Sequence, residues 1–493
     1  MTIIIEPTVM AAEGVSPTVA PIKNVALEAT SELNTVNTDV LNESEFTRSA
    51  VEALGTHVRL VDNDEASGLD LFCYVRCGPT DEGLIRQCRG VVFHKNDIVM
   101  KAFPYTVEYS VADVEKIEET IKSVWSDCSF YDAHEGALIR MFNFGGKWFT
   151  STHRKLNAFR SKWASRESFG TSFKKALEAE VENNAELRVA LPDGEEGLLE
   201  RFQSTLNPNK QYMFLVRNSD ENRIVCAAPV RDTLYHVGTF VDGKLTMDED
   251  IHIPHPTRHR FVDLNDMFSY VERLNPAQLQ GVIVFAPDNK QYKIFHKEYL
   301  ELFRARGNEP SIKFRYLQVR MNRKQTAMLY YLYPEMASVF DDYENAIFDI
   351  SKGIYRSYVN RFIKKNYVTV PVQEFSVIRE CHSWHLEDRE ANRINQNKII
   401  DILNKQSPTS INQMIRRLRS EQVRHTDAKE VSTQRTRSNT IGQSVENSPT
   451  IAGNTPVVTP LLLTKTLANL PPLPPPAVSE KRRGPRVLFK EQK

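Results

Sequence analysis

The sequence predicts an α+β protein: an antiparallel-sheet body is followed by an all-α domain, and both ends are disordered. Short apolar segments flank turn signals in residues 45–307, which is typical of hairpins. Helical periodicity replaces this pattern in residues 308–425. With 493 residues, 41% of them hydrophobic, the chain has room for two or more domains with sizeable cores.

The ends of the chain have compositions that oppose folding. Residues 1–44 contain no aromatic residue and carry six acidic side chains against one basic, so they are predicted to be a disordered acidic leader. Residues 426–493 form a proline-rich basic tail. Within it, Leu470–Pro476 is expected to adopt polyproline II, the conformation that SH3 and WW domains bind, while a plain flexible tail is the favoured interpretation.

Turn residues mark the hairpins of the body. Gly145-Gly146 and Asp242-Gly243 are two-residue hairpin signals between apolar runs. The strand pairs expected around turns are 89–93 with 98–103, 138–144 with 147–152, 239–241 with 244–246, and 282–285 with 291–295. Residues 172–206 break this rhythm with helical composition, so helices are expected between the hairpins.

The helical domain is predicted from spacing. Ile411, Met414, Ile415 and Leu418 recur on one helix face, and Ser410 with Gln413 reads as a capping box at the start of that helix. Residues 311–425 hold 19 basic and 12 acidic side chains. This excess predicts a polyanionic partner such as nucleic acid, while an ordinary solvated helical surface is the alternative.

Composition also limits the compartment. The six cysteines lack paired spacing, which argues against a secreted disulfide scaffold and for a reducing compartment. No run of 18 apolar residues occurs, so no membrane-spanning helix is expected. Two groups contain residue types that can bind zinc. The first is His252, His255 and His259, and the second is Cys381, His382 and His385. Their surroundings favour ordinary histidines, and no metal site is assigned.

A chain of short motifs carries the functional signal. Cys88-Arg89-Gly90 opens a strand, Glu135-Gly136 enters another, and Arg154-Lys155 follows one hairpin later. Asn222-Arg223 and Gln280-Gly281 come next, before Lys293 in the last predicted strand. An acidic-Gly pair followed by a basic patch is a way to build a nucleotide pocket.

In this order, residues 80–300 resemble the nucleotidyltransferase domain of the ATP-dependent RNA ligase family, which is similar to phage RNA ligases, DNA ligases and mRNA capping enzymes. The resemblance implies a lysine that attacks the α-phosphate, ATP with Mg²⁺ as cofactor, and RNA or a nucleotide as partner. It also implies a set of nucleotide- and phosphate-binding residues: Arg89, Glu135, Gly136, Arg154, Lys155, Arg223, Gln280 and Lys293.

The chain differs from the family at the positions that carry the reacting and metal-binding groups. Ala133 occupies the place of the nucleophilic lysine, Gln280 that of a metal-binding carboxylate, and Phe295 that of a second lysine. A ribose-binding glutamate is also missing from Phe214–Val216. The catalytic residue is therefore unknown. Glu135 is the remaining carboxylate candidate, and His134 is a second possible nucleophile on the opposite face of its strand.

Three functions follow from this pattern. The protein is expected to bind a nucleotide or RNA end without covalent catalysis. The first alternative is an active RNA ligase or capping-type enzyme with a non-standard nucleophile, and the second is a structural or virion-associated protein. The ligase-like body with low-complexity ends resembles proteins of large DNA viruses of eukaryotes. This resemblance implies the cytoplasm or nucleus of an infected cell, or the virion, as the location.

Overall fold

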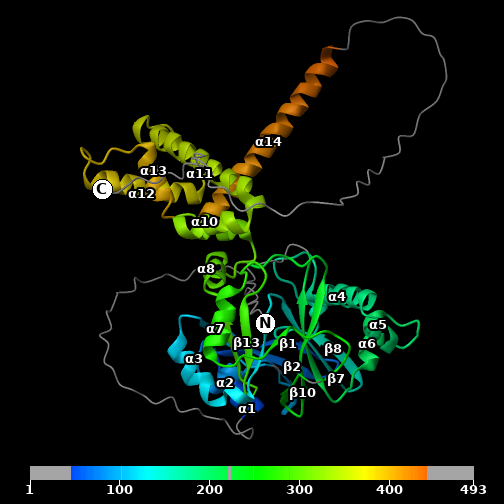
Figure 1. The fold of residues 1–493 in the computed structure, drawn as a ribbon. Helices are drawn as coiled ribbons and strands as arrows, with labels where there is room; N and C mark the ends of the chain where they lie inside the picture. The colour runs from blue at the N-terminus through cyan, green and yellow to red at the C-terminus, as the bar shows by residue number, and fades with distance from the viewer. Residues whose placement is uncertain (1–45, 102, 220–223, 248, 288, 441–493) are drawn as a thin grey trace, which may run out of the picture. The chain divides into compact units, whose positions relative to one another are not determined.

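Three β-sheets and two groups of helices make up the described part of the chain (Figure 1). The computed structural model describes residues 46–101, 103–219, 224–247, 249–287 and 289–440, with side chains up to residue 424. The chain divides into two compact units between Pro334 and Glu335. The predicted disordered leader, most of the predicted tail and the Leu470–Pro476 segment lie outside the described residues.

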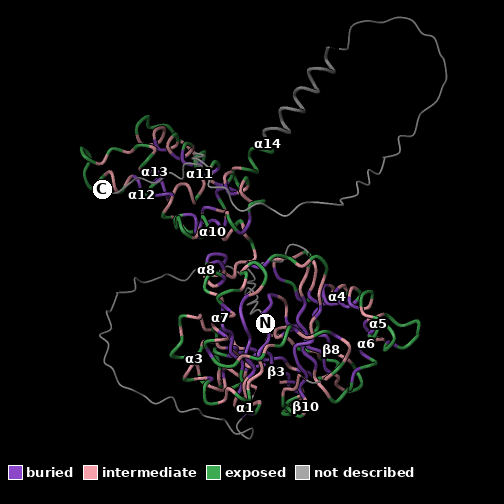
Figure 2. Tube along the Cα trace, in the orientation of Figure 1, coloured by how far each residue is buried: buried purple, intermediate pink, exposed green. Residues whose placement is uncertain are grey.

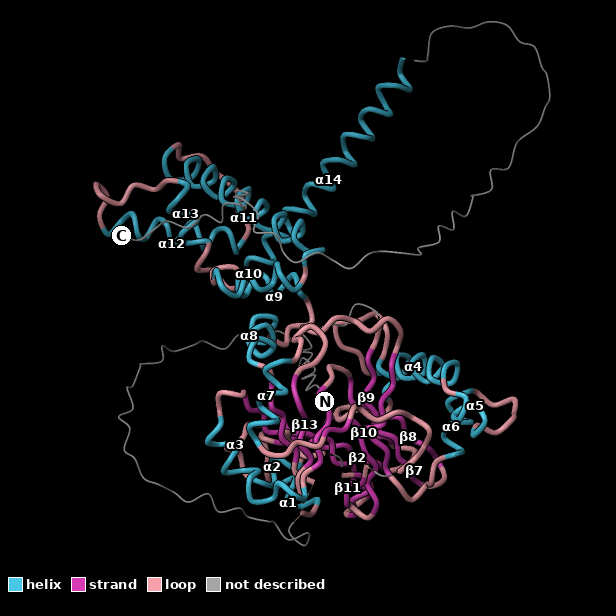
Figure 3. Tube along the Cα trace, in the orientation of Figure 1, coloured by secondary structure: helices cyan, strands magenta, loops and turns pink. Residues whose placement is uncertain are grey.

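Figure 3 shows the strands of the first unit in magenta. Their sheets are antiparallel, apart from the parallel pair β14–β5. In spatial order, the first sheet is β1 (Val58–Asp64), β2 (Leu69–Tyr74), β3 (Arg89–His94) and β4 (Asp97–Met100). The second is β11 (Lys244–Thr246), β10 (Thr233–Val241), β9 (Gln211–Arg217), β7 (Ala137–Phe144) and β8 (Lys147–Ser151). The third is β12 (Arg258–His259), β6 (Ser129–Ala133), β13 (Gly281–Phe285), β14 (Gln291–Phe295) and β5 (Val107–Ser110).

Helices lie between these strands, as the sequence predicts for residues 172–206 and elsewhere. Those of the first unit are α1 (Arg48–Ala53), α2 (Gly83–Gln87), α3 (Val114–Ile121), α4 (Phe169–Asn183), α5 (Ala185–Ala190), α6 (Leu198–Thr205), α7 (Leu264–Arg273), α8 (Lys297–Arg306), α9 (Ile312–Val319) and α10 (Arg323–Leu332). Two 3₁₀ segments, η2 (Lys122–Asp127) and η3 (Ala158–Arg160), complete it.

One hydrophobic core joins the three sheets (Figure 2). The first sheet contributes Leu71 and Val92, the second Leu138 and Met213, and the third Ile283, together with other buried residues. Because side chains alternate along a strand, the neighbours of these residues face away from this core. On the third sheet those neighbours pack with α3 and α7, and on the first sheet they pack with α1.

The predicted fold class and hairpins are confirmed. The turn at Gly145-Gly146 joins β7 to β8, and Asp242-Gly243 joins β10 to β11. One extended segment was predicted wrongly. The strand expected over residues 98–103 ends at Met100, three residues before the fully buried Phe103. The chain at Ile224-Val225 is irregular, and its amides bind a side chain instead of a neighbouring strand.

The second unit is all-helical within its described residues. After the 3₁₀ turn η4 (Pro334–Met336) it contains α11 (Ala337–Tyr358), the π-helical turn η5 (Val359–Ile363), α12 (Val372–Glu387), α13 (Gln396–Leu403) and α14 (Pro408–Thr440). Helices α11 to α14 pack on one another and bury Ile354, Ile378, Ile399 and Ile411. None of the described helices in either unit is long and apolar enough to cross a lipid bilayer.

Both ends of α14 differ from the prediction. The Ser407 hydroxyl accepts a hydrogen bond from the Ser410 amide at 3.2 Å, so Ser407 is the cap and Ser410 lies inside the helix. Pro408 suits the first helical position, because its missing N–H would be unpaired there in any case. The helix also continues to Thr440, beyond the boundary expected at 425, since no glycine or proline interrupts residues 409–440.

The domain boundary also falls later than residue 307, where the sequence analysis placed it. Helices α9 and α10 pack with α8 in the first unit. The Arg306 Nε donates to the Tyr333 hydroxyl at 2.8 Å, and that hydroxyl donates to the Ile224 carbonyl at 2.8 Å. The helical run from residue 310 therefore begins inside the first unit.

Candidate nucleotide-binding site

Position 133, where the resembling family keeps its lysine, lies in the central core. Ala133 ends β6, pairs with Gly281 of β13, and is fully buried. Its methyl group belongs to the same cluster as Tyr131, Leu138 and Ile283. An alanine has no nucleophilic atom, so covalent transfer by the family route has no group to start it at this position.

Glu135 joins the segment after β6 to the irregular chain at 224–225. Its carboxylate accepts hydrogen bonds from the Ile224 amide at 3.1 Å, the Val225 amide at 2.8 Å and the Tyr299 hydroxyl at 2.8 Å. Burial raises the pKa of this carboxyl, although the three donors work in the opposite direction. With its oxygens engaged in this way, Glu135 acts as a structural tie and is poorly placed as a catalytic base.

Gly136 allows this part of the chain to approach β9 closely. A Cβ atom added there would lie 2.5 Å from the Val216 carbonyl oxygen and 2.9 Å from the Leu215 side chain. The glycine of the Glu-Gly pair is thus required for packing between β7 and β9, independently of any ligand.

Lys293 starts a buried chain of hydrogen bonds that ends at Glu135. Its Nζ donates to the Gln280 Oε1 at 2.9 Å, and the Gln280 Nε2 donates to the Tyr299 hydroxyl at 2.6 Å. Burial lowers the pKa of Lys293 to about 8, and the charge of Arg89 lowers it further, while Glu108 favours the charged amine. The structure therefore brings three predicted residues, Glu135, Gln280 and Lys293, into one network.

The predicted arginine of the first motif is held by neutral groups. Arg89 is buried, and its Nη1 donates to the Pro104 carbonyl at 3.3 Å and to the Thr106 hydroxyl at 3.2 Å. Its charge acts on Lys293, so it lies close to the buried network. Arg154 is half-buried in the segment after β8, and Arg223 lies outside the described residues.

Lys155 points elsewhere than expected. Its Nζ forms an ion pair with Asp62 of β1 at 3.2 Å, and the same carboxylate accepts from the Leu156 amide. This side chain therefore ties the segment after β8 to the first sheet.

A pocket of about 570 Å³, including its open mouth, lies beside the Glu-Gly segment. The described residues that line it are Glu135, Gly136, Ala137, Trp163, Phe169, Ser172, Val216, Arg217, Asn218, Ile224, Cys226, Ala227, Ala228 and Pro229. Of the predicted binding residues in the described ranges, Glu135 and Gly136 belong to this lining. Arg89, Arg154, Lys155, Gln280 and Lys293 do not.

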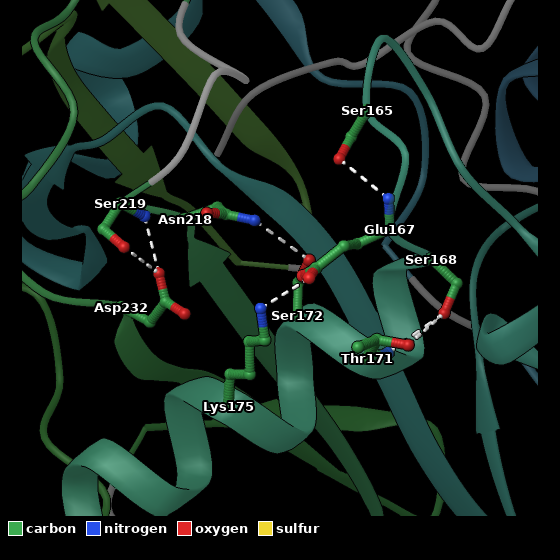
Figure 4. A network of polar contacts seen from close by, with 9 residues as sticks. All are labelled: Ser165, Glu167, Ser168, Thr171, Ser172, Lys175, Asn218, Ser219 and Asp232. Carbon is green, nitrogen blue, oxygen red and sulfur yellow. Dashed lines mark hydrogen bonds and ion pairs between the residues drawn. The ribbon is translucent and has the colours of Figure 1, made fainter. Parts of the chain in front are cut away.

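Polar groups from β9 and α4 meet at this pocket. The Asn218 amide donates to the Ser172 hydroxyl at 3.1 Å, and next to it the Ser219 amide and hydroxyl donate to Asp232 (Figure 4). Arg217 is the one cationic side chain among the described lining residues. The pocket therefore combines apolar walls with hydrogen-bonding groups at the end of β9 and the start of α4.

Trp163 belongs to the lining of the pocket. The side chain is 2% exposed, and its buried indole Nε1 has no hydrogen-bond partner among the described residues. A buried donor without an acceptor is destabilising.

Sequence reasoning missed several residues of the site. Tyr299 and Arg217 lie close in sequence to the predicted positions Lys293 and Phe214–Val216, but they match no residue of the family motifs. Arg140 carried no signal, because its partners are backbone atoms. It is fully buried, and its guanidinium donates to the carbonyls of Gly90 and Thr152. Burial lowers the pKa of this arginine to about 9.

The described residues contain no group of three or more His, Cys, Asp or Glu side chains that could hold a metal ion. Two histidines of the first candidate zinc group, His255 and His259, contact protein oxygen atoms. The Nε2 of His259 lies 2.8 Å from Asp132, and the Nδ1 of His255 lies 2.8 Å from the His236 carbonyl.

Comparison with known proteins finds relatives in iridescent viruses. The chain is 29% identical over 384 residues to an immediate-early protein ICP-46 homolog of Invertebrate iridescent virus 6, covering 71% of this chain and 80% of that protein. It is 28% identical over 353 residues to the homolog of Invertebrate iridescent virus 3, covering 68% and 74%. The match to ICP-46 of Frog virus 3 is 24% identical and covers 50% and 62%. No protein-family model matches the chain.

Two solved structures that resemble the chain are ligases by description. A candidate ATP-dependent DNA ligase from Aquifex aeolicus has a TM-score of 0.34 and 15% identity, with 67% of this chain and 86% of that chain covered. An archaeal ATP-dependent RNA ligase has a TM-score of 0.34 and 11% identity, with 57% and 69% covered.

Proposed function

We propose that the first unit binds a nucleotide or the 5′-phosphorylated end of an RNA in the pocket beside Glu135 and Gly136, without forming a covalent adduct at position 133. The observation that carries the proposal is the contrast between these neighbouring positions. The Glu-Gly-Ala segment lines an open pocket. Two residues earlier, Ala133 presents only a methyl group, buried in the core.

The pocket chemistry supports a nucleotide. Trp163, Phe169 and Pro229 provide apolar wall for a base, and Arg217 provides a cation for a phosphate. The start of α4 adds the positive end of a helix dipole, because Phe169 and Ser172 in its first turn are among the lining residues.

The residues do not fit a resident magnesium ion. Glu135 already accepts three hydrogen bonds, and Gln280, which replaces a carboxylate, is held between Lys293 and Tyr299. Mg²⁺ prefers charged oxygen ligands and near-octahedral geometry. ATP is therefore proposed as a ligand, and any Mg²⁺ is expected to arrive with its phosphates.

The relatives suggest where this binding takes place. They are described as immediate-early proteins of two invertebrate iridescent viruses and of Frog virus 3. We accordingly place the protein inside a virus-infected cell, acting on nucleotides or RNA.

Lys293 favours a second candidate function. A fully buried amine with a pKa of about 8 is partly neutral at neutral pH, which is how lysine nucleophiles are activated. In this alternative, the protein is an active RNA ligase or capping-type enzyme that forms its lysyl-nucleotide at position 293. Its weakness is that Lys293 lies outside the lining of the pocket.

One experiment separates the two candidates. The full chain is incubated with α-labelled ATP or GTP and Mg²⁺ or Mn²⁺, and denatured protein is examined for covalent label beside an active ligase. The proposal predicts no label. A labelled band that Lys293→Met abolishes would establish the alternative, since Met keeps the bulk of the side chain and removes the amine.

Binding is measured in parallel by calorimetry with ATP, GTP and a 5′-phosphorylated RNA oligonucleotide. Arg217→Ala should weaken binding about tenfold or more, because a hydrogen bond to a charged group contributes about 1.5–3 kcal/mol. Arg59→Ala, at an exposed arginine of β1, is the matched control. No binding by the folded chain, or equal affinities for the two variants, would refute the proposed site.

A further inference from the structure

The second unit contains a basic and aromatic segment that runs from the last turns of α11 to the start of α12. From residue 350 to residue 373 the chain carries five basic side chains and no acidic one. The same stretch holds four aromatic residues: Tyr355, Tyr358, Phe362 and Tyr367. Interleaved cations and aromatic rings are typical of surfaces that contact nucleic-acid strands.

Tyr358 and the preceding Ile354 are buried, whereas the part of the segment after α11 is displayed on the surface. Helix α11 runs into the π-helical turn η5, and π-helical turns occur frequently at functional sites. Lys365 follows with a φ of 59°, a left-handed conformation that is uncommon for a lysine. Tyr367 is 91% exposed and Ile363 is 66% exposed. Large exposed side chains of this kind mark a surface available to a partner.

Lys352 pairs with Asp349 at 3.0 Å, but the three cations that follow α11 are not neutralised by a described carboxylate. Among the described residues, no carboxylate lies within 4 Å of the basic groups of Arg361, Lys364 or Lys365. The Arg361 guanidinium lies over Phe375, 4.9 Å from the ring centroid. The segment therefore offers positive charge that a partner's anionic groups can pair with.

A second element extends the aromatic surface. The His382 ring of α12 stacks on Phe362, with centroids 3.9 Å apart and an angle of 23° between the rings. Desolvation lowers the pKa of His382, and the positive charges of His385, Lys365 and Arg389 lower it further. Positive groups thus converge on this stacked pair from both sides of the loop.

We propose that Arg361, Phe362, Lys364, Lys365, Tyr367 and His382, here called the basic-aromatic patch, bind single-stranded nucleic acid. The lysines pair with backbone phosphates, and the exposed Tyr367 ring stacks on an unpaired base. A single strand fits better than a duplex, because a duplex keeps its base faces covered. This proposal is independent of the pocket, since the patch belongs to the second unit.

The test is fluorescence anisotropy of the full chain with labelled 20-nucleotide single-stranded RNA, single-stranded DNA and duplex DNA over a range of salt concentrations. Lys364→Ala with Lys365→Ala should weaken single-strand binding about tenfold at 0.15 M salt. It should also reduce the slope of log K against log salt by about 1.4, since each lost phosphate contact contributes about 0.7. Lys405→Ala with Arg416→Ala, two exposed cations of the same unit, is the charge-matched control.

Stacking is tested separately. Tyr367→Ala should weaken binding at least about fivefold at every salt concentration, and Tyr367→Phe should restore it, because the ring and not the hydroxyl stacks. Either an RNA or a DNA preference supports the proposal. Equal losses for the patch and control pairs would overturn it. So would stronger binding of the duplex, or binding of phosphatidylserine vesicles without binding of a strand. Arg217→Ala should weaken ATP binding but leave the difference between the patch and control pairs unchanged, which separates this result from the pocket.

Discussion

His134 shows how a single buried residue makes stability depend on pH. Its ring stacks on Tyr235, with centroids 4.8 Å apart, and burial, aided by the charge of Arg217, lowers its pKa to about 3. The unfolded chain, with a histidine pKa of about 6.5, takes up the proton first as pH falls. Stability is therefore lost progressively between about pH 6.5 and pH 3, by about 2 kcal/mol for this residue at pH 5.

His134→Phe keeps a ring against Tyr235 and removes the titration. The fall in the unfolding free energy between pH 7 and pH 5, measured by urea denaturation, should be about 2 kcal/mol smaller in the variant. His236 and His153, whose pKa values burial also lowers, remain in both proteins and contribute to the remaining pH dependence. An identical fall in variant and native protein would show that His134 is not buried in its neutral form.

At the residue scale, the sequence predicts features that depend on neighbouring residues in the chain. Gly145-Gly146 and Asp242-Gly243 give their hairpins because turn geometry depends on the residues in the turn. The contact between Tyr299 and Glu135 spans 164 positions and has no local signature. Lys155 fits its motif by position, yet it pairs with Asp62, 93 residues earlier in the chain. Which carboxylate a lysine reaches depends on how sheets pack, which motif order does not contain.

Helix α8 stabilises the site through one hydroxyl group. Tyr299 accepts from Gln280 and donates to Glu135, in a region where all three side chains are buried. Tyr299→Phe leaves buried polar atoms without a partner and should lower the unfolding free energy by about 1–3 kcal/mol. Urea denaturation measures the change.

Tyr331→Phe is the matched control for that measurement. Tyr331 lies on α10 and is 69% exposed, so loss of its hydroxyl should change stability by less than about 0.5 kcal/mol. If the two variants were equally stable, the chain of hydrogen bonds from Lys293 to Glu135 would not contribute to the fold.

Elements were predicted well where periodicity alone defines them, and less well at their ends. The apolar spacing of residues 411–418 correctly gives a helix, but its cap is Ser407, because Pro408 can begin a helix. Ile224 and Val225 have apolar side chains but do not form a strand. Their amides bind a carboxylate that precedes them by about 90 residues, a contact that no local pattern indicates.

On the scale of the whole molecule, the boundary between the units is testable by truncation. A chain that ends after Pro334 should keep nucleotide binding and a cooperative thermal transition. A chain that ends after Gly307 removes α9, α10 and Tyr333, whose hydroxyl links Arg306 to the Ile224 carbonyl beside the pocket. That shorter chain should melt at least several degrees lower and lose affinity for ATP.

Calorimetry of both truncations against the full chain decides this prediction. Equal melting temperatures for the two truncations would favour the earlier boundary at residue 307. The sequence missed the later boundary for a physical reason: helical periodicity reports local structure, whereas a domain is defined by contacts between distant segments.

The buried methyl group of Ala133 has a kinetic consequence. An enzyme that forms a covalent adduct retains its nucleotide until the next chemical step, whatever the surrounding supply. A pocket without that step exchanges ligand freely, so its occupancy follows the free nucleotide or RNA-end concentration relative to the dissociation constant. In the proposed role, the protein would therefore report the abundance of its ligand in the cell, and it would release the ligand unchanged when that abundance fell.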